Sequence, residues 1–370
     1  MQKIRPNLGE RAFLRSLRAQ VARSASTRRA AGLKLGIGDD CAILQPPPGH
    51  QIFVTTDFSL ETIHFRRDWH PPESVGHRCL ARGLSDLAAM GAQPLAAFLS
   101  LALPAELVQT RRGQTAWRER FLTGFLALAE KYHVPLAGGD TSQSPQMPVS
   151  SSGSKSGTGW ALADIVLVGT APRNRALLRS GAEAGDRIYV TGHLGGAAAE
   201  LAHLAANPRR FRNCKASVAG YPNPHPHLFP EPRLAVGAWL LKNRRATAAI
   251  DISDGLSTDL DHLCEESGGE ESGLAAVIDA EALPFHPLAQ PKSQPITNEA
   301  LDLALDGGED YELLFTASPN VRIPCRIAGV PIACIGVMRR QAPGQTRMVL
   351  ADQVNGHRRE RPLPPGGWEH

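Results

Sequence analysis

The fold is decided by the stretch Glu73-Ser-Val-Gly-His-Arg-Cys-Leu-Ala-Arg-Gly-Leu-Ser-Asp-Leu-Ala-Ala-Met-Gly-Ala92, which runs into Gln93-Pro-Leu-Ala-Ala-Phe-Leu-Ser-Leu-Ala-Leu103. In the first part, apolar side chains such as Leu80, Leu84 and Leu87 recur at helical spacing. The second part is a short, almost wholly apolar run, which is typical of a buried strand. The pattern predicts a helix over 73–92 followed by a strand over 96–103.

The same alternation continues on both sides of this unit. A Pro-rich turn at 46–49 precedes the β-rich run Gln51-Ile-Phe-Val-Thr-Thr56, which we expect to form a strand. Downstream, the patterns predict a helix over 115–132 and strands over 134–137 and 163–168. Strands alternating with helices indicate an α/β fold.

The second half repeats this organisation. We expect strands over 187–192 and 247–252, and helices over 195–206 and 233–242. A chain of 370 residues is long enough for two domains. The stretch 179–192 reads as the start of a second domain, so the boundary should fall near residue 173. We therefore expect an N-terminal domain over 1–172 and a C-terminal domain over 173–370.

Two stretches depart from the alternation. Residues 142–159 are rich in Ser, Gly and Pro, a composition that predicts a mobile loop. Residues 207–232 form a Pro/His-rich linker that contains His225 and His227. Since no other metal-binding side chains lie near these histidines in the sequence, we expect them to be solvated rather than metal ligands.

Composition and charge limit the possible functions. No apolar run approaches the roughly 20 residues that a membrane-spanning helix needs. The N-terminus lacks the features of a secretory signal, so we expect a cytoplasmic protein without a membrane partner. The net charge of +4 does not predict nucleic-acid binding. The arginines of the first thirty residues surround Phe13, Leu14, Leu17 and Val21, which have the spacing of an amphipathic helix.

The six cysteines are scattered along the chain and form no Cys-x-x-Cys pair. This pattern predicts reduced, mostly buried thiols rather than disulfides or a zinc site. The cysteines are Cys41, Cys79, Cys214, Cys264, Cys325 and Cys334.

Acidic residues recur in Gly- and Ser-flanked positions after strand-like runs. They are Asp39, Asp40, Asp57, Asp140, Asp251 and Asp254. Carboxylates brought together at strand ends repel one another unless cations are present. Oxygen ligands favour Mg²⁺, and a site with many Asp residues indicates several Mg²⁺ ions around a polyphosphate. The sequence contains neither a P-loop nor the protein-kinase motif set.

Taken together, the motifs resemble the thiamine-monophosphate kinase family. They occur in the family's order over nearly the whole chain: Gly36-Ile-Gly-Asp-Asp-Cys-Ala42, Thr55-Thr-Asp57, His64-Phe65, Leu84-Ser-Asp-Leu-Ala-Ala-Met-Gly-Ala92, Gly138-Gly-Asp-Thr141, Asp251-Ile-Ser-Asp-Gly-Leu256 and Gly307-Gly-Glu-Asp-Tyr-Glu-Leu313. The wider superfamily includes aminoimidazole ribonucleotide synthetase.

The resemblance implies a two-domain α/β (α+β) subunit that dimerises through its N-terminal mixed sheet. It also implies ATP-dependent phosphorylation of thiamine monophosphate to thiamine diphosphate. The positions that match the family's magnesium ligands are Asp40, Thr55, Thr56, Asp57, Asp86, Asp140, Asp251 and Asp254. The matching ATP contacts are Gly139, Asp140, Arg179 and Ser253, and the substrate side is matched by His64, Glu309 and Trp368.

The chemistry of the implied reaction needs no general base. The second pKa of a phosphate monoester is about 6, so the attacking oxygen is already largely anionic at neutral pH. Direct in-line transfer aided by Mg²⁺ is therefore expected. Two alternatives stay open at this stage: an ATP-dependent superfamily member with another substrate, and a non-catalytic nucleotide- or RNA-binding protein.

Overall fold

The computed structural model describes residues 8–24, 26–27, 32–109, 115–145, 159–216, 222–268, 273–291, 295–342, 344, 346–354 and 357–369. The loop expected over 142–159 lies largely outside these residues. Among the described helices, none is long and apolar enough to cross a lipid bilayer.

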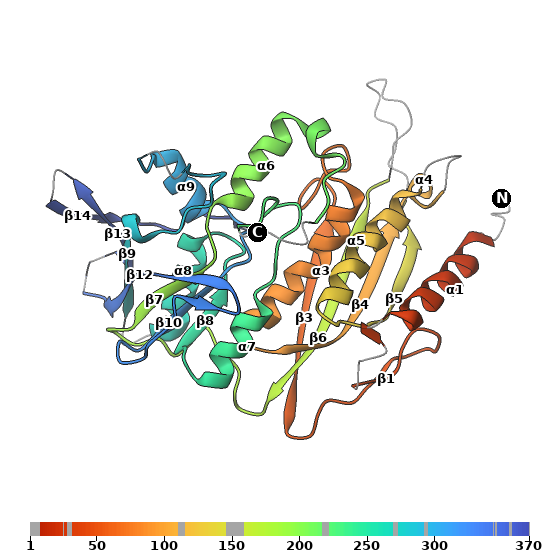
Figure 1. Ribbon diagram of the computed structural model, residues 1–370, viewed down its shortest axis with the longest axis horizontal. Coiled ribbons are helices and arrows are strands. Elements are labelled where there is room, and N and C mark those ends of the chain that lie inside the picture. Colours follow the sequence, from red (N-terminus) through yellow and green to blue (C-terminus); the bar gives the residue numbers. More distant parts are fainter. Residues whose placement is uncertain are drawn as a thin grey trace.

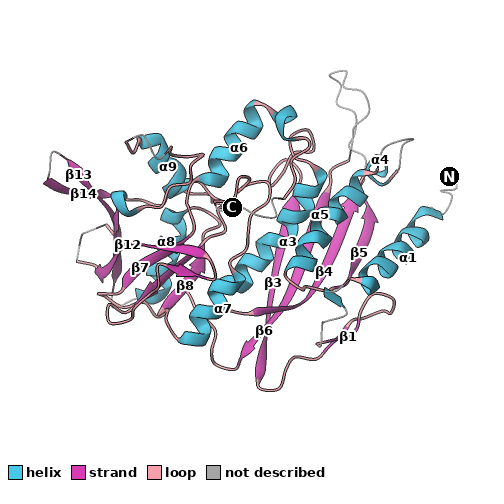
Figure 2. Cartoon of the chain, in the orientation of Figure 1, coloured by secondary structure: helices cyan, strands magenta, loops and turns pink. Residues whose placement is uncertain are grey.

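A four-stranded mixed sheet forms the N-terminal half (Figures 1 and 2). Its order is β3-β6-β4-β5, and the strands are β3 (His50–Leu60), β4 (Gln93–Leu103), β5 (Leu136–Gln143) and β6 (Leu162–Pro172). The β4–β5 pair is parallel and the other pairs are antiparallel. Parallel pairing follows because a helix, α5 (Trp117–Lys131), lies between β4 and β5 and returns the chain to the same end of the sheet.

Two helices, α5 and α3 (Pro72–Ala89), cover one face of this sheet. Helix α3 is buried along almost its whole length between the sheet, α5 and the second half of the chain. Glycines allow the two helix backbones to touch, since a Cβ at Gly76 would lie 1.9 Å from the carbonyl oxygen of Phe121. A Cβ at Gly124 would lie 1.8 Å from the carbonyl oxygen of Glu73. This close packing fixes α3 over the sheet.

The opposite face of the sheet exposes apolar side chains. Successive side chains of a strand point to opposite faces. Phe53, Thr55 and Asp57 of β3 therefore point toward α3, whereas Ile52, Val54, Thr56 and Phe58 point outward, and all four are exposed. We call Ile52, Val54 and Phe58 the outer apolar face.

The C-terminal half contains an eight-stranded sheet in the order β14-β13-β9-β12-β7-β10-β8, with β11 paired to β12. Its strands are β7 (Arg187–Thr191), β8 (Ala248–Asp251), β9 (Leu274–Asp279), β10 (Leu313–Ala317), β11 (Arg326–Ile327), β12 (Val330–Arg340), β13 (Met348–Val354) and β14 (His357–Pro362). The helices of this half are α6 (Gly196–Ala206), α7 (Leu234–Asn243), α8 (Leu256–Gly268) and α9 (Asn298–Asp306). The remaining short elements are α4 (Ala105–Val108), η1 (Pro208–Phe211), η2 (Ala280–Ala282) and the pair β1 (Leu33–Leu35) and β2 (Ile43–Leu44).

The two sheets meet through α3 and α7. A Cβ at Gly237 in α7 would lie 1.9 Å from the carbonyl oxygen of Ala88 in α3, so the two helices pack in direct backbone contact. The main hydrophobic core continues across this junction, from Leu84 of α3 to Leu240 of α7 and Phe315 of β10. The packing brings the end of β8 close to β3 and α3, where the candidate site lies.

Most predicted elements are confirmed, with shifts of a few residues at their ends. The N-terminal amphipathic helix is α1 (Leu8–Arg23), in which Phe13 and Val21 are buried but Leu14 is 39% exposed, contrary to prediction. The strand predicted over 134–137 was placed wrongly, because β5 runs through the Gly138–Thr141 motif to Gln143. The prediction that Asp57 follows a strand was also wrong, since β3 continues past it to Leu60.

The prediction of mostly buried thiols was wrong. All six cysteines are free, but only Cys79 and Cys264 are buried, whereas Cys41, Cys325 and Cys334 are exposed. The exposed cysteines lie in loops or on β12, outside the two hydrophobic cores.

Candidate active site

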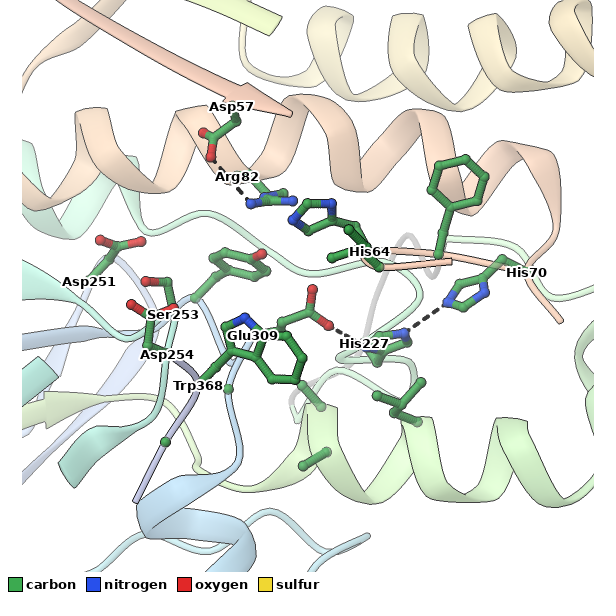
Figure 3. Close-up of a pocket in the computed structure, with 18 of the residues that line it drawn as sticks. Asp57, His64, His70, Arg82, His227, Asp251, Ser253, Asp254, Glu309 and Trp368 are labelled. Atoms are coloured by element: carbon green, nitrogen blue, oxygen red, sulfur yellow. Dashed lines mark hydrogen bonds and ion pairs between the residues drawn. The ribbon is translucent and has the colours of Figure 1, made fainter. Parts of the chain in front are cut away.

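A cavity of about 620 Å³ lies between the two halves of the chain (Figure 3). One end is acidic, with Asp57, Asp86, Asp251 and Asp254. His70 and His227 lie at the opposite side (Figure 3), and the lining also includes Phe65, Trp69, Ala197 and Leu201. This size and this polarity suit a small ligand that is anionic at one end and heteroaromatic at the other.

Three carboxylates from separate elements form the core of the acidic end. Asp57 comes from β3, Asp86 from α3 and Asp251 from the last position of β8. Burial first, and then the charge of Asp86, raise the pKa of Asp57 to about 7. Burial also raises the pKa values of Asp86 and Asp251, and for Asp251 the charge of Asp86 adds to the effect. Burial, together with repulsion between the carboxylates, thus disfavours their charged forms, which a bound cation would stabilise.

Neighbouring side chains only partly compensate for this repulsion. Asp86 accepts a hydrogen bond from Thr55, and Asp251 accepts one from Ser85 Oγ at 2.7 Å. Arg82 Nη2 lies 3.4 Å from Asp57 Oδ1, but Asp57 Oδ2 is buried and has no hydrogen-bond partner among the described residues. This unsatisfied oxygen fits a metal ligand better than a structural carboxylate.

The loop after β8 brings Ser253 and Asp254 to the same cavity. Asp259, in the first turn of α8, folds back over this loop, and its Oδ2 accepts the backbone N–H groups of Ser253, Asp254 and Gly255 at 3.0, 3.1 and 3.2 Å. The loop is therefore held in shape without a ligand.

His64 lies on the loop that follows β3 and lines the cavity. Its Nδ1 accepts the backbone N–H of Leu60 at 3.0 Å. A neutral His64 must therefore carry its proton on Nε2, so the ring can act as a hydrogen-bond donor through that atom.

Glu309 is held on the cavity wall by its backbone and by its side chain. Its φ of 67° lies in the left-handed region, and its N–H donates to the carbonyl oxygen of Ser253 at 2.8 Å. Its Oε1 accepts a hydrogen bond from Arg78, and its Oε2 lies 3.0 Å from His227 Nδ1. Although burial opposes ionisation, Arg78 and His227 hold the pKa of this carboxyl well below its usual range.

The C-terminal tail brings Trp368 to the mouth of the cavity. The backbone N–H of Trp368 donates to the carbonyl oxygen of Asp254 at 2.9 Å. The tail can approach this closely because Gly367 has no side chain, since a Cβ there would lie 2.1 Å from the same oxygen. The Trp368 residue is 59% exposed and its indole lines the cavity (Figure 3).

The predicted site residues divide between two places. The cavity contains Asp57, Asp86, Asp251, Asp254, Ser253, His64, Glu309 and Trp368. Asp40, Gly139 and Asp140 instead line a second cavity of about 720 Å³ between α1, the 37–42 loop and β5. Thr56 is exposed on the far face of the first sheet. Thr55 and Arg179 do not line the first cavity, although Thr55 contacts Asp86 and the charge of Arg179 acts on Asp86.

Several cavity residues were missed by the sequence analysis. Asp306 stands directly before the Gly307-Gly308-Glu309 motif, a position that could have signalled it. Arg82 follows Arg78 by one helical turn but gave no motif signal. The prediction that His227 is solvated was wrong: it is 2% exposed and lines the cavity, because the carboxylate of Glu200 holds the linker against α6.

The described residues fit Mg²⁺ bound together with a phosphate ligand better than a closed metal site. Within the part of the chain that is described, no three His, Cys, Asp or Glu side chains converge into a ready-made metal site. Mg²⁺ usually retains several waters and binds one or two carboxylates plus substrate phosphates, so such a site need not be complete beforehand. Asp57, Asp86 and Asp251 provide the oxygen donors for this mode of binding, and a bound cation would stabilise their charged forms, which burial disfavours.

Comparisons with known proteins agree with this geometry. Residues 38–173 match the family described as AIR synthase related protein, N-terminal domain. The chain is 38% identical to thiamine-monophosphate kinase of Escherichia coli (strain K12), over 84% of this chain and 86% of that protein. It is 32% identical to thiamine-monophosphate kinase of Bacillus subtilis (strain 168), over 88% of this chain and 94% of that protein.

Solved structures give the same result. Thiamine-monophosphate kinase from Stenotrophomonas maltophilia K279a matches with a TM-score of 0.70 and 32% identity, over 90% of this chain and 95% of that chain. A structure described as AaThiL complexed with AMPPCP and TMP matches with a TM-score of 0.65 and 26% identity, over 98% and 97% of the two chains. The chain therefore belongs to the thiamine-monophosphate kinase family.

Proposed function

We propose that this protein transfers the γ-phosphoryl group of ATP directly to the phosphate of thiamine monophosphate, which yields thiamine diphosphate and ADP. The observation that carries the proposal is a single cavity with a cluster of buried carboxylates at one end and ring-bearing side chains at the other. The family assignment and the relative described as a complex with AMPPCP and TMP support the same reaction.

At the acidic end, Asp57, Asp86, Asp251 and Asp254 would hold Mg²⁺, and Thr55 would orient Asp86 through its hydrogen bond. When bound, Mg²⁺ supplies positive charge that offsets the charge of the phosphates and of the transferring group. Arg82, whose Nη2 already lies 3.4 Å from Asp57, would add a fixed positive charge at this end. The protein thus contributes position and charge, and no phosphoenzyme is needed.

Beside this cluster, His64, Glu309 and Trp368 would bind thiamine monophosphate. His64 can donate through Nε2 to a phosphate oxygen, since its Nδ1 is occupied by the N–H of Leu60. The thiazolium ring is a cation and can lie against the indole of Trp368. The aminopyrimidine carries N–H donors that Glu309 can accept.

For ATP, we propose contacts from Gly139, Asp140, Arg179 and Ser253, with Asp40, Thr56 and Asp140 completing the Mg²⁺ sites. In one chain, Asp40 and Asp140 line a different cavity from Ser253. If two copies pair through the outer apolar face, each copy would bring its own side chains to the exposed face of the other copy's first sheet, where Thr56 lies. We therefore propose a cytoplasmic homodimer with an ATP- and Mg²⁺-binding domain over 1–172 and a second domain over 173–370 that completes both sites.

One assay tests the reaction. Purified protein is incubated with ATP, Mg²⁺ and thiamine monophosphate, and the products are separated by chromatography. We expect equal amounts of thiamine diphosphate and ADP, and neither when Mg²⁺ is removed with EDTA. ADP formation that does not depend on thiamine monophosphate would contradict the proposed substrate, and the absence of ADP under all conditions would contradict the kinase activity.

A further inference from the structure

The Pro/His-rich segment before α7 forms part of the cavity wall. Glu200 of α6 is buried, and its Oε2 accepts the backbone N–H groups of His227 and Leu228 at 2.8 and 3.1 Å. Its Oε1 lies 2.6 Å from His225 Nδ1. Leu228 and Phe229 pack with Leu204 and Phe211 in a small hydrophobic cluster. The segment is thus fixed on both sides of His227, whose side chain is directed at Glu309 (Figure 3).

The contacts of His227 determine where its proton lies. Arg78 Nη1 lies 2.6 Å from His227 Nε2, and an arginine can only donate. His227 Nε2 is therefore an acceptor, and a neutral ring must carry its proton on Nδ1. Burial and the charge of Arg78 lower the pKa of His227, which keeps the ring neutral near pH 7. His227 Nδ1 lies 3.0 Å from Glu309 Oε2.

Arg78 and His227 each contact one oxygen of Glu309. Arg78 donates a hydrogen bond to Oε1, while His227 Nδ1 lies 3.0 Å from Oε2 without the alignment of a hydrogen bond. An ionised carboxylate has about four lone-pair positions, so each oxygen keeps one for a ligand. Because Arg78 cancels the charge of Glu309, the cluster is neutral as a whole. It is better suited to bind a neutral N–H donor than to attract a cation.

We propose that His227 is a positioning residue, which with Arg78 fixes Glu309 so that its free lone pairs accept the amino group of the substrate's aminopyrimidine. The inference rests on the proposed function and adds a residue that the family's motifs do not include. The left-handed backbone of Glu309 supports it, because a strained conformation kept at a cavity wall indicates that the orientation of the side chain matters.

Kinetics of three variants test the proposal. In His227→Ala, we expect the KM for thiamine monophosphate to rise about tenfold, because Glu309 loses a polar contact that fixes its orientation, while kcat and the KM for ATP change less than about twofold. His227→Asn keeps a donor at the place of Nδ1 and should recover most of the loss. His227→Gln has its donor at the place of Nε2 and should not. The matched control is His203→Ala, which removes an exposed ring on α6 that does not line the cavity.

A substrate analogue makes the test specific. In an analogue with the amino group replaced by hydrogen, the donor to Glu309 is absent. The wild-type protein should prefer thiamine monophosphate over this analogue, and His227→Ala should lose most of that preference. Equal discrimination by both proteins, or a parallel rise in the KM for ATP, would overturn the proposal.

A readout without turnover separates this inference from the proposed function. Failure of the wild-type protein to phosphorylate thiamine monophosphate would reject the function. Independently, ¹⁵N NMR of the His227 ring should show a neutral Nδ1–H tautomer that is perturbed by Glu309→Gln. An Nε2–H tautomer, or a ring that does not respond to Glu309→Gln, would overturn the positioning role whatever the substrate is.

Discussion

Asp57 occupies the interior of a strand, yet its carboxylate has the properties of a ligand rather than of a structural group. Its pKa is raised to about 7 by burial and by Asp86, and its Oδ2 has no partner among the described residues. A carboxylate whose pKa is shifted by burial and by a like charge is typical of a functional site.

We therefore expect Asp57→Asn to lower kcat by at least about a hundredfold, since the variant loses charge that would hold Mg²⁺. The thermal midpoint should stay the same or rise, because the substitution removes repulsion with Asp86. The measurements are steady-state kinetics over a magnesium titration and thermal unfolding. Asp68→Asn, an exposed position on the loop after β3, is the control and should change neither. Near-normal activity of Asp57→Asn at any Mg²⁺ concentration would remove Asp57 from the metal site.

A second prediction concerns His77, which is buried in α3 and whose Nε2 lies 2.8 Å from the carbonyl oxygen of Pro230. Burial lowers the pKa of His77 to about 4 in the folded protein, whereas the unfolded value is about 6.5. The unfolded state therefore binds more protons below pH 6.5, and the stability that the neutral ring contributes is lost as the pH falls from 6.5 toward 4.

In His77→Gln, which keeps a donor near the place of Nε2, this pH-dependent loss should disappear. Between pH 7 and pH 5, the wild-type protein should lose about 2 kcal/mol more unfolding free energy than the variant. Urea unfolding at a series of pH values measures the difference. The comparison with the variant is needed because buried carboxylates such as Asp310, with a pKa raised to about 7, change stability in the opposite direction. Parallel pH profiles would show that His77 does not titrate as inferred.

The site residues that could be identified from the sequence were those that stand close together in one motif. Asp251, Ser253 and Asp254 lie within four positions of one another, and the structure keeps them together. His227 could not be recognised, because its role depends on Glu200, Arg78 and Glu309, which are distant in sequence and meet only after folding. The sequence around His227 in the Pro/His-rich segment contains no information about these distant partners.

At the scale of elements, helices and strands with strong periodicity were predicted to within a few residues. The structure places α3 at Pro72–Ala89, against a prediction of 73–92. The ends of β3 and β5 were predicted less well, since Asp57 and Gly138–Thr141 have the composition of turns but are held in strands by pairing with β6 and β4. Tertiary pairing overrode local preference at these two places.

The C-terminal tail is the element that most directly tests substrate identity. The tail is fixed to α8 by hydrogen bonds from Gly366 N to Ser257 Oγ and from Gly367 N to Thr258 Oγ1, both at 3.1 Å. Trp368→Ala should therefore leave the tail in place and remove only the ring. A contact between an aromatic ring and a cation contributes about 0.5–2 kcal/mol, so the KM for thiamine monophosphate should rise by up to about thirtyfold.

The KM for ATP should hardly change in Trp368→Ala, and Trp368→Phe should recover much of the loss. Trp160→Ala is a suitable control, because Trp160 is similarly exposed but does not line the cavity. If Trp368→Ala raised the KM for ATP alone, or changed neither constant, the tail would not contact the substrate.

At the scale of the whole molecule, the candidate residues lie on both faces of the first sheet. Thr55 and Asp57 point toward α3, and Asp57 also lines the cavity, while Thr56 and the outer apolar face point the other way. Sequence motifs could not reveal this division, because neighbouring positions of a strand belong to opposite faces. Exposed apolar side chains grouped on one face are typical of a protein–protein interface, and here they lie on β3, an edge strand of its sheet.

The homodimer can therefore be tested at the centre of this face. Val54 is 63% exposed, and its side chain points away from α3, so Val54→Lys should not disturb the hydrophobic core. If two copies pair here, burying a lysine in each would be costly, and the variant should be monomeric in sedimentation equilibrium with an unchanged far-UV circular dichroism spectrum. Turnover should fall with the dimer, because Thr56 and Asp140 would lose the partner subunit. Val337→Lys, at a position 38% exposed on β12 of the other sheet, should remain dimeric and active. A Val54→Lys variant that stays dimeric and active would place the subunit contact elsewhere, and a monomeric, fully active wild-type protein would show that one chain assembles the site alone.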